Sequence, residues 1–352
     1  MKEKSMSKNR KLASVQRIWE VTPIEGADRI ELVKVLGWQC VANKGQFQKG
    51  DLCVYFEIDS FLPVRPEFEF LRASSYRKTD IMGEGFRLKT MKFRGQISQG
   101  LVLPLTSFTA IPADVGSDAT ELLGVRKWEI EERATTGGTV IGTLPSDVPH
   151  TDETRIQAMP ELLEAFRGKQ YYITTKMDGS SHSLSIDTDG FHVTGHNYEY
   201  KDDDSFAFYR FVKARNYRSA MERYMTEHGI TMLTIQGEFC APGIQRNRLK
   251  LTKPEWYVFT IRINGDRVGL MKTREVANAV GVPMVPVEEC GEDLTALYPT
   301  VDALLERAEG EYPNGGSKEG IVIRTVEPEF CPLISAPLSV KVVSNRYLLK
   351  NE

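Results

Sequence analysis

Apolar and polar residues alternate over short distances in the first third of the chain. Apolar runs such as 52–56 and 101–103 have the length of single strands, and turns that contain glycine, such as Lys44-Gly45 and Arg94-Gly95, separate them. Strands at this close spacing are typical of a small barrel. Residues 12 to about 107 are therefore predicted to form an all-β domain.

The pattern changes in the middle of the chain. Residues 131–152 are rich in Thr, Gly and Pro and have no helical period, so we predict a linker there. Beyond it, segments with helical spacing alternate with β-forming segments, which is typical of an α+β domain. Helices are predicted at 153–168, 204–228, 273–280 and 301–308, and strands on both sides of Lys176 and at 191–194, 232–238, 256–263, 320–324 and 338–343.

These patterns predict three parts: a domain at 1–130, a linker at 131–152 and a domain at 153–352. The sequence contains no run of 18 apolar residues, and its basic N-terminus lacks the apolar core of a signal peptide. The protein is therefore expected inside the cell, in the cytoplasm or the nucleus, without a membrane partner. The cysteines are odd in number and include no CxxC pair, so we expect buried thiols rather than disulfides or a zinc site. They are Cys40, Cys53, Cys240, Cys290 and Cys331.

The distribution of charge is uneven. The net charge of −3 argues against a uniformly basic protein, but the segment 72–94 carries seven Arg or Lys against two acidic residues. A second basic run has no acidic residue between its members, Arg246, Arg248, Lys250 and Lys253. Both patches could bind phosphates, or both could be solvated surface.

One lysine stands out by its setting. The stretch YYITTKMDGSSHSLSID places Lys176 between two β-forming segments, at the mouth of a strand and before a tight turn that needs Gly179. KxDG alone is a weak signal, and a solvated turn is the competing interpretation. Four further stretches follow in order: TIQGEFCAPGIQRN, WYVFTIRI, EGIVIRT and LSVKVVSNRYLLK.

Each stretch contains residue types that a nucleotide pocket needs. A lysine nucleophile requires a lowered pKa to attack an α-phosphate, and the phosphate requires cations, which Lys341 and Arg324 can provide. Glu319 offers a hard oxygen ligand for a divalent metal. A carboxylate such as Glu238 suits a ribose hydroxyl, and Phe259 offers an aromatic face to a purine.

In this order the stretches resemble the covalent nucleotidyltransferases, which include polynucleotide ligases and mRNA capping enzymes. The run GEF-A-PGIQ-N is similar to RNA ligases of the second phage type. In the first half, PIEGADRIE, GDLCVYFEIDSFLP and FRGQISQGLVLPL resemble the OB-fold domain of the nick-sealing subgroup. The implied fold class is α+β, with an N-terminal OB-fold β-barrel and a C-terminal ligase-type nucleotidyltransferase domain.

The resemblance implies an ATP-dependent RNA ligase. Its cofactors would be ATP and Mg²⁺ or Mn²⁺, and its partner would be nicked duplex RNA or an RNA/DNA duplex, bound by a monomer. Lys176 would take AMP, and Glu319 would serve the metal-assisted step. Nucleotide contacts fall on Arg155, Thr175, Asp178, Gly179, Glu238, Phe259, Arg324 and Lys341, and nucleic-acid contacts on Arg94, His196, Asn197 and Arg246.

The sequence departs from the family pattern at three places. Thr175 stands where many ligases have glutamate, His196 and Asn197 stand where an arginine is usual, and Val343 replaces the second lysine of the last motif. These departures put the handling of the base and of the nick in doubt.

Two alternatives stay open. A DNA ligase or a GTP-using capping enzyme usually carries an OB domain after the last motif, and this chain ends nine residues after Val343. A non-catalytic RNA-binding protein would not be expected to keep Lys176, Glu238, Glu319 and Lys341. His150, His182, His192 and His228, and the aromatic cluster at 206–211, are predicted to be packing or surface residues.

Overall fold

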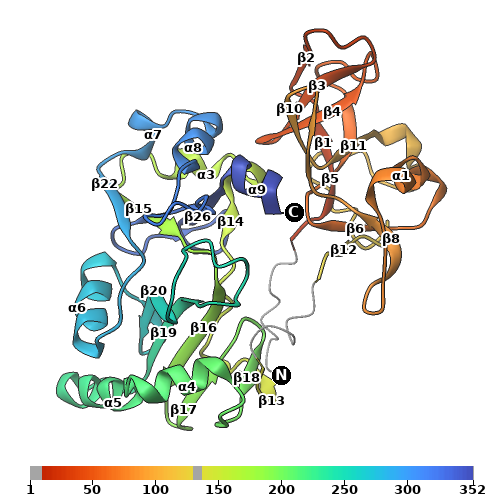
Figure 1. Cartoon of the computed structure of the whole chain (residues 1–352). Helices are drawn as coiled ribbons and strands as arrows, with labels where there is room; N and C mark the ends of the chain where they lie inside the picture. Colours follow the sequence, from red (N-terminus) through yellow and green to blue (C-terminus); the bar gives the residue numbers. More distant parts are fainter. Residues whose placement is uncertain (1–9, 130–136, 352) are drawn as a thin grey trace. The chain divides into compact units, whose positions relative to one another are not determined.

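The computed structural model describes residues 10–129 and 137–351. The chain divides into two compact units, residues 1–130 with 348–352 and residues 131–347. Figure 1 shows short strands throughout the first unit and a mixture of helices and strands in the second. No helix in the described ranges is long and apolar enough to cross a membrane.

Short antiparallel strands build the N-terminal unit. Its central strand β5 (Leu52–Phe56) pairs with β1 (Ala13–Arg17) on one side and with β11 (Leu101–Pro104) on the other. Phe56 and its apolar neighbours form the core, which confirms the predicted strands of this region. The other elements are β2 (Glu20–Pro23), β3 (Ile30–Val35), β4 (Trp38–Asn43), β6 (Ser60–Pro63), η1 (Pro66–Leu71), α1 (Arg72–Ser75), β7 (Tyr76–Thr79), β8 (Gly83–Arg87), β9 (Thr90–Phe93), β10 (Gln96–Gln99), η2 (Leu105–Ser107) and β12 (Arg126–Lys127).

A seven-stranded sheet forms one half of the C-terminal unit. Residues such as Leu184 and Ile235 on one face pack against three helices, whereas the opposite face carries buried polar residues such as Ser185 and Gln236. The strand order is β13 (Val140–Thr143), β18 (Tyr198–Tyr200), β17 (Phe191–Thr194), β16 (Ser180–Ile186), β19 (Leu233–Cys240), β20 (Glu255–Ile263) and β21 (Asp266–Arg267). The helices are α4 (Ala207–Ala214), α5 (Tyr217–His228) and α6 (Leu270–Val280).

A five-stranded sheet forms the other half. Ile173, Ile321 and Val340 point from one face into a second apolar core. Because side chains alternate along a strand, Lys176, Arg324 and Lys341 lie on the opposite face. The strand order is β14 (Thr154–Arg155), β26 (Ser339–Val343), β23 (Gly320–Thr325), β15 (Tyr171–Lys176) and β22 (Val287–Gly291). The remaining elements are η3 (Ile156–Ala158), α3 (Leu162–Ala165), α7 (Leu294–Leu297), α8 (Val301–Ala308), β24 (Phe330–Cys331), β25 (Ala336–Pro337) and α9 (Asn345–Asn351).

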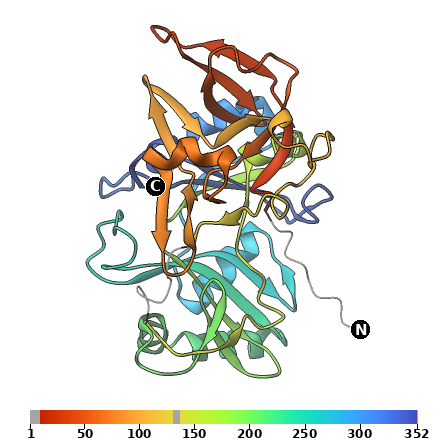
Figure 2. The ribbon, with the colours of Figure 1, turned by 90° about the vertical axis from the view of Figure 1, so that its right-hand side faces the viewer.

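The polar faces of the two sheets approach each other. The guanidinium of Arg324 in β23 donates to the carbonyl of Phe259 in β20, and the amide of Gly179 donates to the Glu238 carboxylate in β19 at 3.2 Å. In both views, α4 and α5 lie on the side of the seven-stranded sheet that faces away from the five-stranded sheet (Figures 1 and 2). The residues quoted for a nucleotide pocket therefore gather between the sheets.

One predicted helix is wrong, and a second is confirmed only as two shorter helices. The segment 153–168 contains a two-residue strand, a 3-10 turn and the four-residue α3, because Thr154 and Arg155 pair with β26 and because Met159 precedes Pro160, which disfavours a helical conformation. The segment 204–228 is two helices, because Asn216 between them is left-handed with φ 52°. The predicted strands on both sides of Lys176, at 191–194 and beyond are confirmed.

Part of the predicted linker is ordered within the C-terminal unit. Residues 131–136 lie outside the described residues, but β13 at 140–143 pairs with β18. The segment then follows the polar face of the seven-stranded sheet. There Ser185 donates to Asp147 at 2.7 Å, and Gln236 donates to the carbonyl of Pro149 at 2.9 Å.

The cysteine prediction holds with one exception. All five thiols are free and four are buried, but Cys290 is exposed. It lies in β22, the edge strand of the five-stranded sheet, where one side of the strand faces solvent.

Candidate active site

Lys176 is the last residue of β15 and lies directly beside the strand that begins with Gly320. Its Nζ is 2.8 Å from the Glu319 carboxylate. The hydroxyl of Tyr312 donates to the carbonyl of Lys176 at 2.7 Å and accepts from the amide of Glu319 at 3.2 Å. Tyr312 therefore ties the backbones of the two residues together, although no sequence pattern singled it out.

Several carboxylates act on the Lys176 amine. Burial lowers the pKa of Lys176, but Glu319, Glu238 and Asp178 outweigh it, so the pKa is raised above its ordinary value. The expectation of a lowered pKa is therefore wrong for the ligand-free protein. The reason is that carboxylates from three segments act on this amine.

Glu238 projects from β19 toward the KxDG turn. Burial, together with Glu319 and Asp178, raises the pKa of Glu238 to about 7, although Lys176 acts in the opposite direction. The turn comes close to β19, and a Cβ on Gly179 would lie 2.5 Å from the carbonyl oxygen of Phe239. Glycine is needed at 179 because of this close approach.

Asp178 is 4% exposed and its carboxylate has two partners. The Arg248 guanidinium donates to Oδ2, and the Tyr347 hydroxyl donates to Oδ1 at 2.7 Å. The sequence placed Arg248 in a basic patch with Arg246, but Arg248 turns inward and only 11% of its side chain is exposed. Tyr347, which belongs to α9, was not singled out by the sequence.

Lys341 and Arg155 are register partners on the parallel strands β26 and β14. The Lys341 amine is 3.8 Å from the Asp152 carboxylate, and His196 lies 3.3 Å from the same carboxylate. The structure thus brings together two predicted phosphate contacts and one predicted nucleic-acid contact. Asn197 follows His196 at an exposed position.

Arg324 has a different setting from Lys341. It is 3% exposed and donates to Glu153 at 2.7 Å and to the Phe259 carbonyl, so it joins the two sheets. Its guanidinium lies 5.8 Å from the centre of the Phe259 ring. Phe259 is the extra residue of a bulge between β19 and β20: Val258 pairs with Gly237 and Thr260 pairs with Gln236, so Phe259 has no register partner. A bulge of this kind changes the direction of a side chain.

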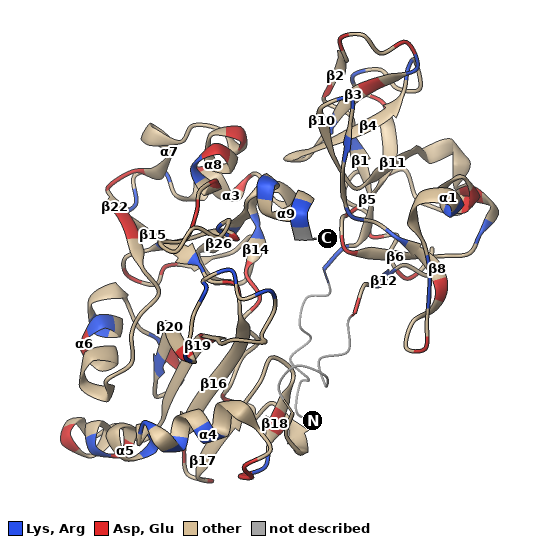
Figure 3. Ribbon diagram, in the orientation of Figure 1, with Lys and Arg blue, Asp and Glu red and all other residues tan. Residues whose placement is uncertain are grey.

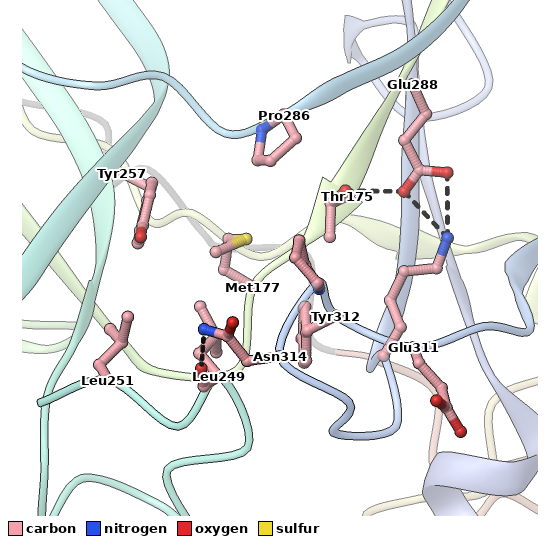
Figure 4. A pocket seen from close by; sticks show the side chains of 12 residues that line it. Thr175, Met177, Leu249, Leu251, Tyr257, Pro286, Glu288, Glu311, Tyr312 and Asn314 are labelled. Carbon is pink, nitrogen blue, oxygen red and sulfur yellow. Dashed lines mark hydrogen bonds and ion pairs between the residues drawn. The ribbon is translucent and has the colours of Figure 1, made fainter.

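A cavity of about 330 Å³ lies next to the KxDG strand (Figure 4). Thr175 lines it and donates to Glu288 at 2.7 Å. Lys318 at 2.9 Å and Arg307 at 2.8 Å also bind Glu288. Burial raises the pKa of this carboxyl, but its hydrogen bonds with Lys318, Thr175 and Arg307 lower the pKa by more. The other lining residues are Met177, Leu249, Leu251, Tyr257, Pro286, Glu311, Tyr312, Pro313, Asn314 and Lys318.

The acidic groups fit a metal site that substrate phosphates and water complete better than a site made of protein ligands alone. Within residues 10–129 and 137–351, no group of three or more His, Cys, Asp or Glu is arranged to hold an ion. Mg²⁺ is usually bound by one or two carboxylates, with the remaining positions filled by substrate phosphates and water. Glu319 and Glu238, both facing Lys176, suit that arrangement.

The remaining predicted nucleic-acid residues lie at exposed turns. Arg94 is in the N-terminal unit, between β9 and β10, with a positive φ of 48°, and Arg246 is in the loop after β19. Figure 3 shows acidic residues in β22 and basic residues in α9.

His182 is structural, as the sequence predicts. Its ring packs 4.5 Å from Phe208 and 5.4 Å from Phe206, between ring centres. Burial lowers the pKa of His182 to about 4. The predicted aromatic core at 206–211 is confirmed.

Comparison with known proteins places both halves of the chain. The RNA ligase family matches residues 169–343, and an OB-fold domain family matches residues 12–105. No curated protein matches. Among solved structures, the Naegleria gruberi RNA ligase with PPi is 31% identical, with a TM-score of 0.85 over 96% of this chain and 98% of that chain. Two point mutants of the same ligase, one solved with ATP and Mn and one with AMP and Mn, are each 30% identical over 97% of this chain and 100% of theirs, with TM-scores of 0.87 and 0.86.

Proposed function

The chain belongs to the RNA ligase family and carries an N-terminal OB-fold domain, and from that premise we propose that it joins RNA ends through an AMP carried on Lys176. The observation that supports this most is the position of the lysine. Its amine is held by Glu319 at the end of β15, with Glu238 close by, between two facing sheets. The family resemblance noted in the sequence is confirmed, and neither the DNA ligase nor the capping-enzyme alternative is needed.

The first step is proposed to be lysine adenylylation. The Lys176 ammonium first loses a proton to solvent; its free nitrogen then attacks the α-phosphorus of ATP, an N–P bond forms, and the bond to the leaving pyrophosphate breaks. Lys341 and Arg155 would provide positive charge for the phosphates from neighbouring strands. Glu238, whose carboxylate accepts from the Gly179 amide where β19 meets the KxDG turn, would bind the ribose.

ATP and a divalent metal are the cofactors of this proposal, and the related ligase has been solved with ATP and Mn. Glu319 would hold the metal together with the phosphates, with the Glu238 carboxylate nearby. When bound, the metal supplies positive charge against these carboxylates and the leaving pyrophosphate. In the ligand-free protein the carboxylates keep Lys176 protonated, so loss of the proton depends on a change in their charge.

The adenine is proposed to be bound near Phe259 and Thr175. The Thr175 hydroxyl donates its hydrogen bond to Glu288, so the Thr175 oxygen can only accept one from the base. A hydrogen-bond acceptor suits the exocyclic amino group of adenine, which donates, better than the exocyclic oxygen of guanine, which accepts. Thr175 can therefore favour ATP over GTP even though it replaces the glutamate found in many ligases.

The second and third steps concern the polynucleotide. AMP is proposed to move from Lys176 to a 5′-phosphate, and a 3′-hydroxyl then attacks and expels AMP. The proposed substrate is a nick in duplex RNA or in an RNA-containing duplex, because a 2′-hydroxyl lets a protein distinguish RNA from DNA. Contacts are assigned to Arg94, His196, Asn197 and Arg246. The OB domain would bind the duplex. The predicted domain at 153–352 would carry out the adenylylation and transfer steps.

Transfer of label from the nucleotide tests the first step. Purified protein is incubated with Mg²⁺ or Mn²⁺ and with ATP or GTP labelled with 32P at the α-phosphate. We expect label from ATP on wild type and on the control Lys169→Met, whose lysine is paired with Glu329 outside the site. Lys176→Met is expected to take no label. Label on Lys176→Met, or equal labelling by GTP, would contradict the assignment.

A further inference from the structure

The KxDG turn is tied to two residues that are not among the predicted nucleotide contacts. Asp178 comes two residues after Lys176, and its carboxylate binds Arg248 from the loop after β19 and Tyr347 from α9. The three residues are separated by 70 and 169 positions in the sequence. The turn that carries the nucleophile is thus fixed by two distant parts of the C-terminal unit.

The two partners of Asp178 also support each other. The Arg248 guanidinium lies 4.7 Å from the centre of the Tyr347 ring, in the geometry of a cation–π contact. Behind Arg248, the chain passes so close to Gly316 that a Cβ there would collide with the Arg248 backbone. Arg248 therefore has little room to move away from Asp178.

Removing either partner would leave a buried carboxylate short of hydrogen bonds. Such a group recovers its partners from solvent only if the turn moves. A movement of the turn carries Met177 and Lys176 with it and changes the approach of the lysine to its target. Displacements of this size matter because reacting atoms must be held close to their reactive geometry.

Resting on the proposed function, we propose that Arg248 and Tyr347 are positioning residues for lysine adenylylation. They hold Asp178, and through it the turn that presents Lys176 to the α-phosphate. Neither side chain touches the nucleotide in this proposal. Their loss should therefore slow AMP transfer at saturating ATP and leave the KM for ATP nearly unchanged.

The chain offers a matched control for the tyrosine. Tyr224 is 3% exposed, and its hydroxyl donates to the Glu275 carboxylate at 2.9 Å, on the far side of the seven-stranded sheet. Tyr347→Phe and Tyr224→Phe thus each remove one hydroxyl–carboxylate hydrogen bond. Arg248→Lys keeps the charge and loses the planar guanidinium, whereas Arg248→Met loses both.

The experiment measures single-turnover formation of lysyl-AMP in the full-length protein at several ATP concentrations. We expect the maximal rate of Tyr347→Phe to fall roughly tenfold, the effect of one hydrogen bond to a charged group, and that of Tyr224→Phe to match wild type. Arg248→Met should be slower than Arg248→Lys. A wild-type rate for Tyr347→Phe, or an effect confined to the KM for ATP, would overturn the proposal.

Amide hydrogen exchange in the ligand-free protein provides a second measurement that does not depend on activity. Peptides that cover residues 176–180 should exchange faster in Tyr347→Phe than in wild type or Tyr224→Phe. Faster exchange in α9 alone would mean that Tyr347 only anchors the helix, and this would overturn the positioning role. If wild type takes no label from ATP, the proposed function fails. Hydrogen exchange at residues 176–180 would still show whether the contact of Tyr347 with Asp178 orders the KxDG turn.

Discussion

Replacing Glu238 by glutamine is expected to stabilise the ligand-free protein at pH 8. Burial and the nearby carboxylates Glu319 and Asp178 raise the pKa of Glu238 from 4.5 to about 7. A carboxyl whose pKa is higher in the folded state contributes stability below its unfolded pKa and loses that contribution as the pH rises through its folded pKa. Wild type therefore loses stability between about pH 4.5 and pH 7 through this group, and Glu238→Gln does not.

The size of the effect follows from the difference between the two pKa values. At about 1.36 kcal/mol for each unit of pKa difference, the ionised form of Glu238 is disfavoured by about 3–4 kcal/mol. For a unit of this size, one kcal/mol moves the unfolding midpoint by about 2–4 °C. We thus expect a rise of several degrees at pH 8 and a much smaller rise at pH 5, where Glu238 is protonated in the folded protein.

Scanning calorimetry of wild type and variants at pH 5 and pH 8 measures this shift. Glu288→Gln is the control of opposite sign, because the ion pairs of Glu288 with Lys318 and Arg307 lower its pKa in the folded state. Glu288→Gln should lower the unfolding midpoint at pH 8. If the two units unfold in separate transitions, the transition that this variant shifts is that of the C-terminal unit. A lower midpoint for Glu238→Gln at pH 8, or an equal change at both pH values, would refute the reasoning.

Three other substitutions or treatments follow from the same structure. Arg324→Ala should destabilise the protein by about 3–5 kcal/mol in urea unfolding, because it breaks a buried ion pair with Glu153, and a loss below about 1 kcal/mol would contradict this. Gly179→Ala should abolish labelling by ATP, because the new Cβ meets the backbone of β19, and retained labelling would show that the turn can relax. A thiol reagent should modify one cysteine in the native protein, Cys290, with the buried thiols reacting only after denaturation; mass spectrometry of the modified peptides checks this.

The strands that carry the nucleotide residues could be predicted because their pattern is local. β15, β16, β19, β23 and β26 each show alternation or an apolar run that is readable within a few residues, and the structure confirms them. The wrong helix at 153–168 and the break in the helix at 204–228 have causes that hydrophobic periodicity does not reveal. The first segment contains a proline after Met159, and the second contains a left-handed residue at Asn216.

The parts of the site that could not be predicted depend on contacts across the fold. Arg248 looked like a member of a basic surface patch until the structure placed Asp178 against it. The predicted direction of the Lys176 pKa was wrong for the same reason, because Glu238 and Glu319 come from segments far away in the sequence. Glu288 reaches Thr175 only because the register of β15 and β22 shifts beside it.

Sealing of defined nicks tests the central claim most directly. Four duplexes of one sequence, with RNA or DNA on each side of a 3′-hydroxyl/5′-phosphate nick, are incubated with ATP and Mg²⁺ or Mn²⁺ at one salt concentration, together with a single-stranded control. We expect sealing when the strand that offers the 3′-hydroxyl is RNA, with a 5′-adenylylated strand as the intermediate and no product from Lys176→Met. Efficient sealing of the all-DNA nick would contradict the RNA ligase assignment, and equal joining of single-stranded ends would contradict the duplex substrate.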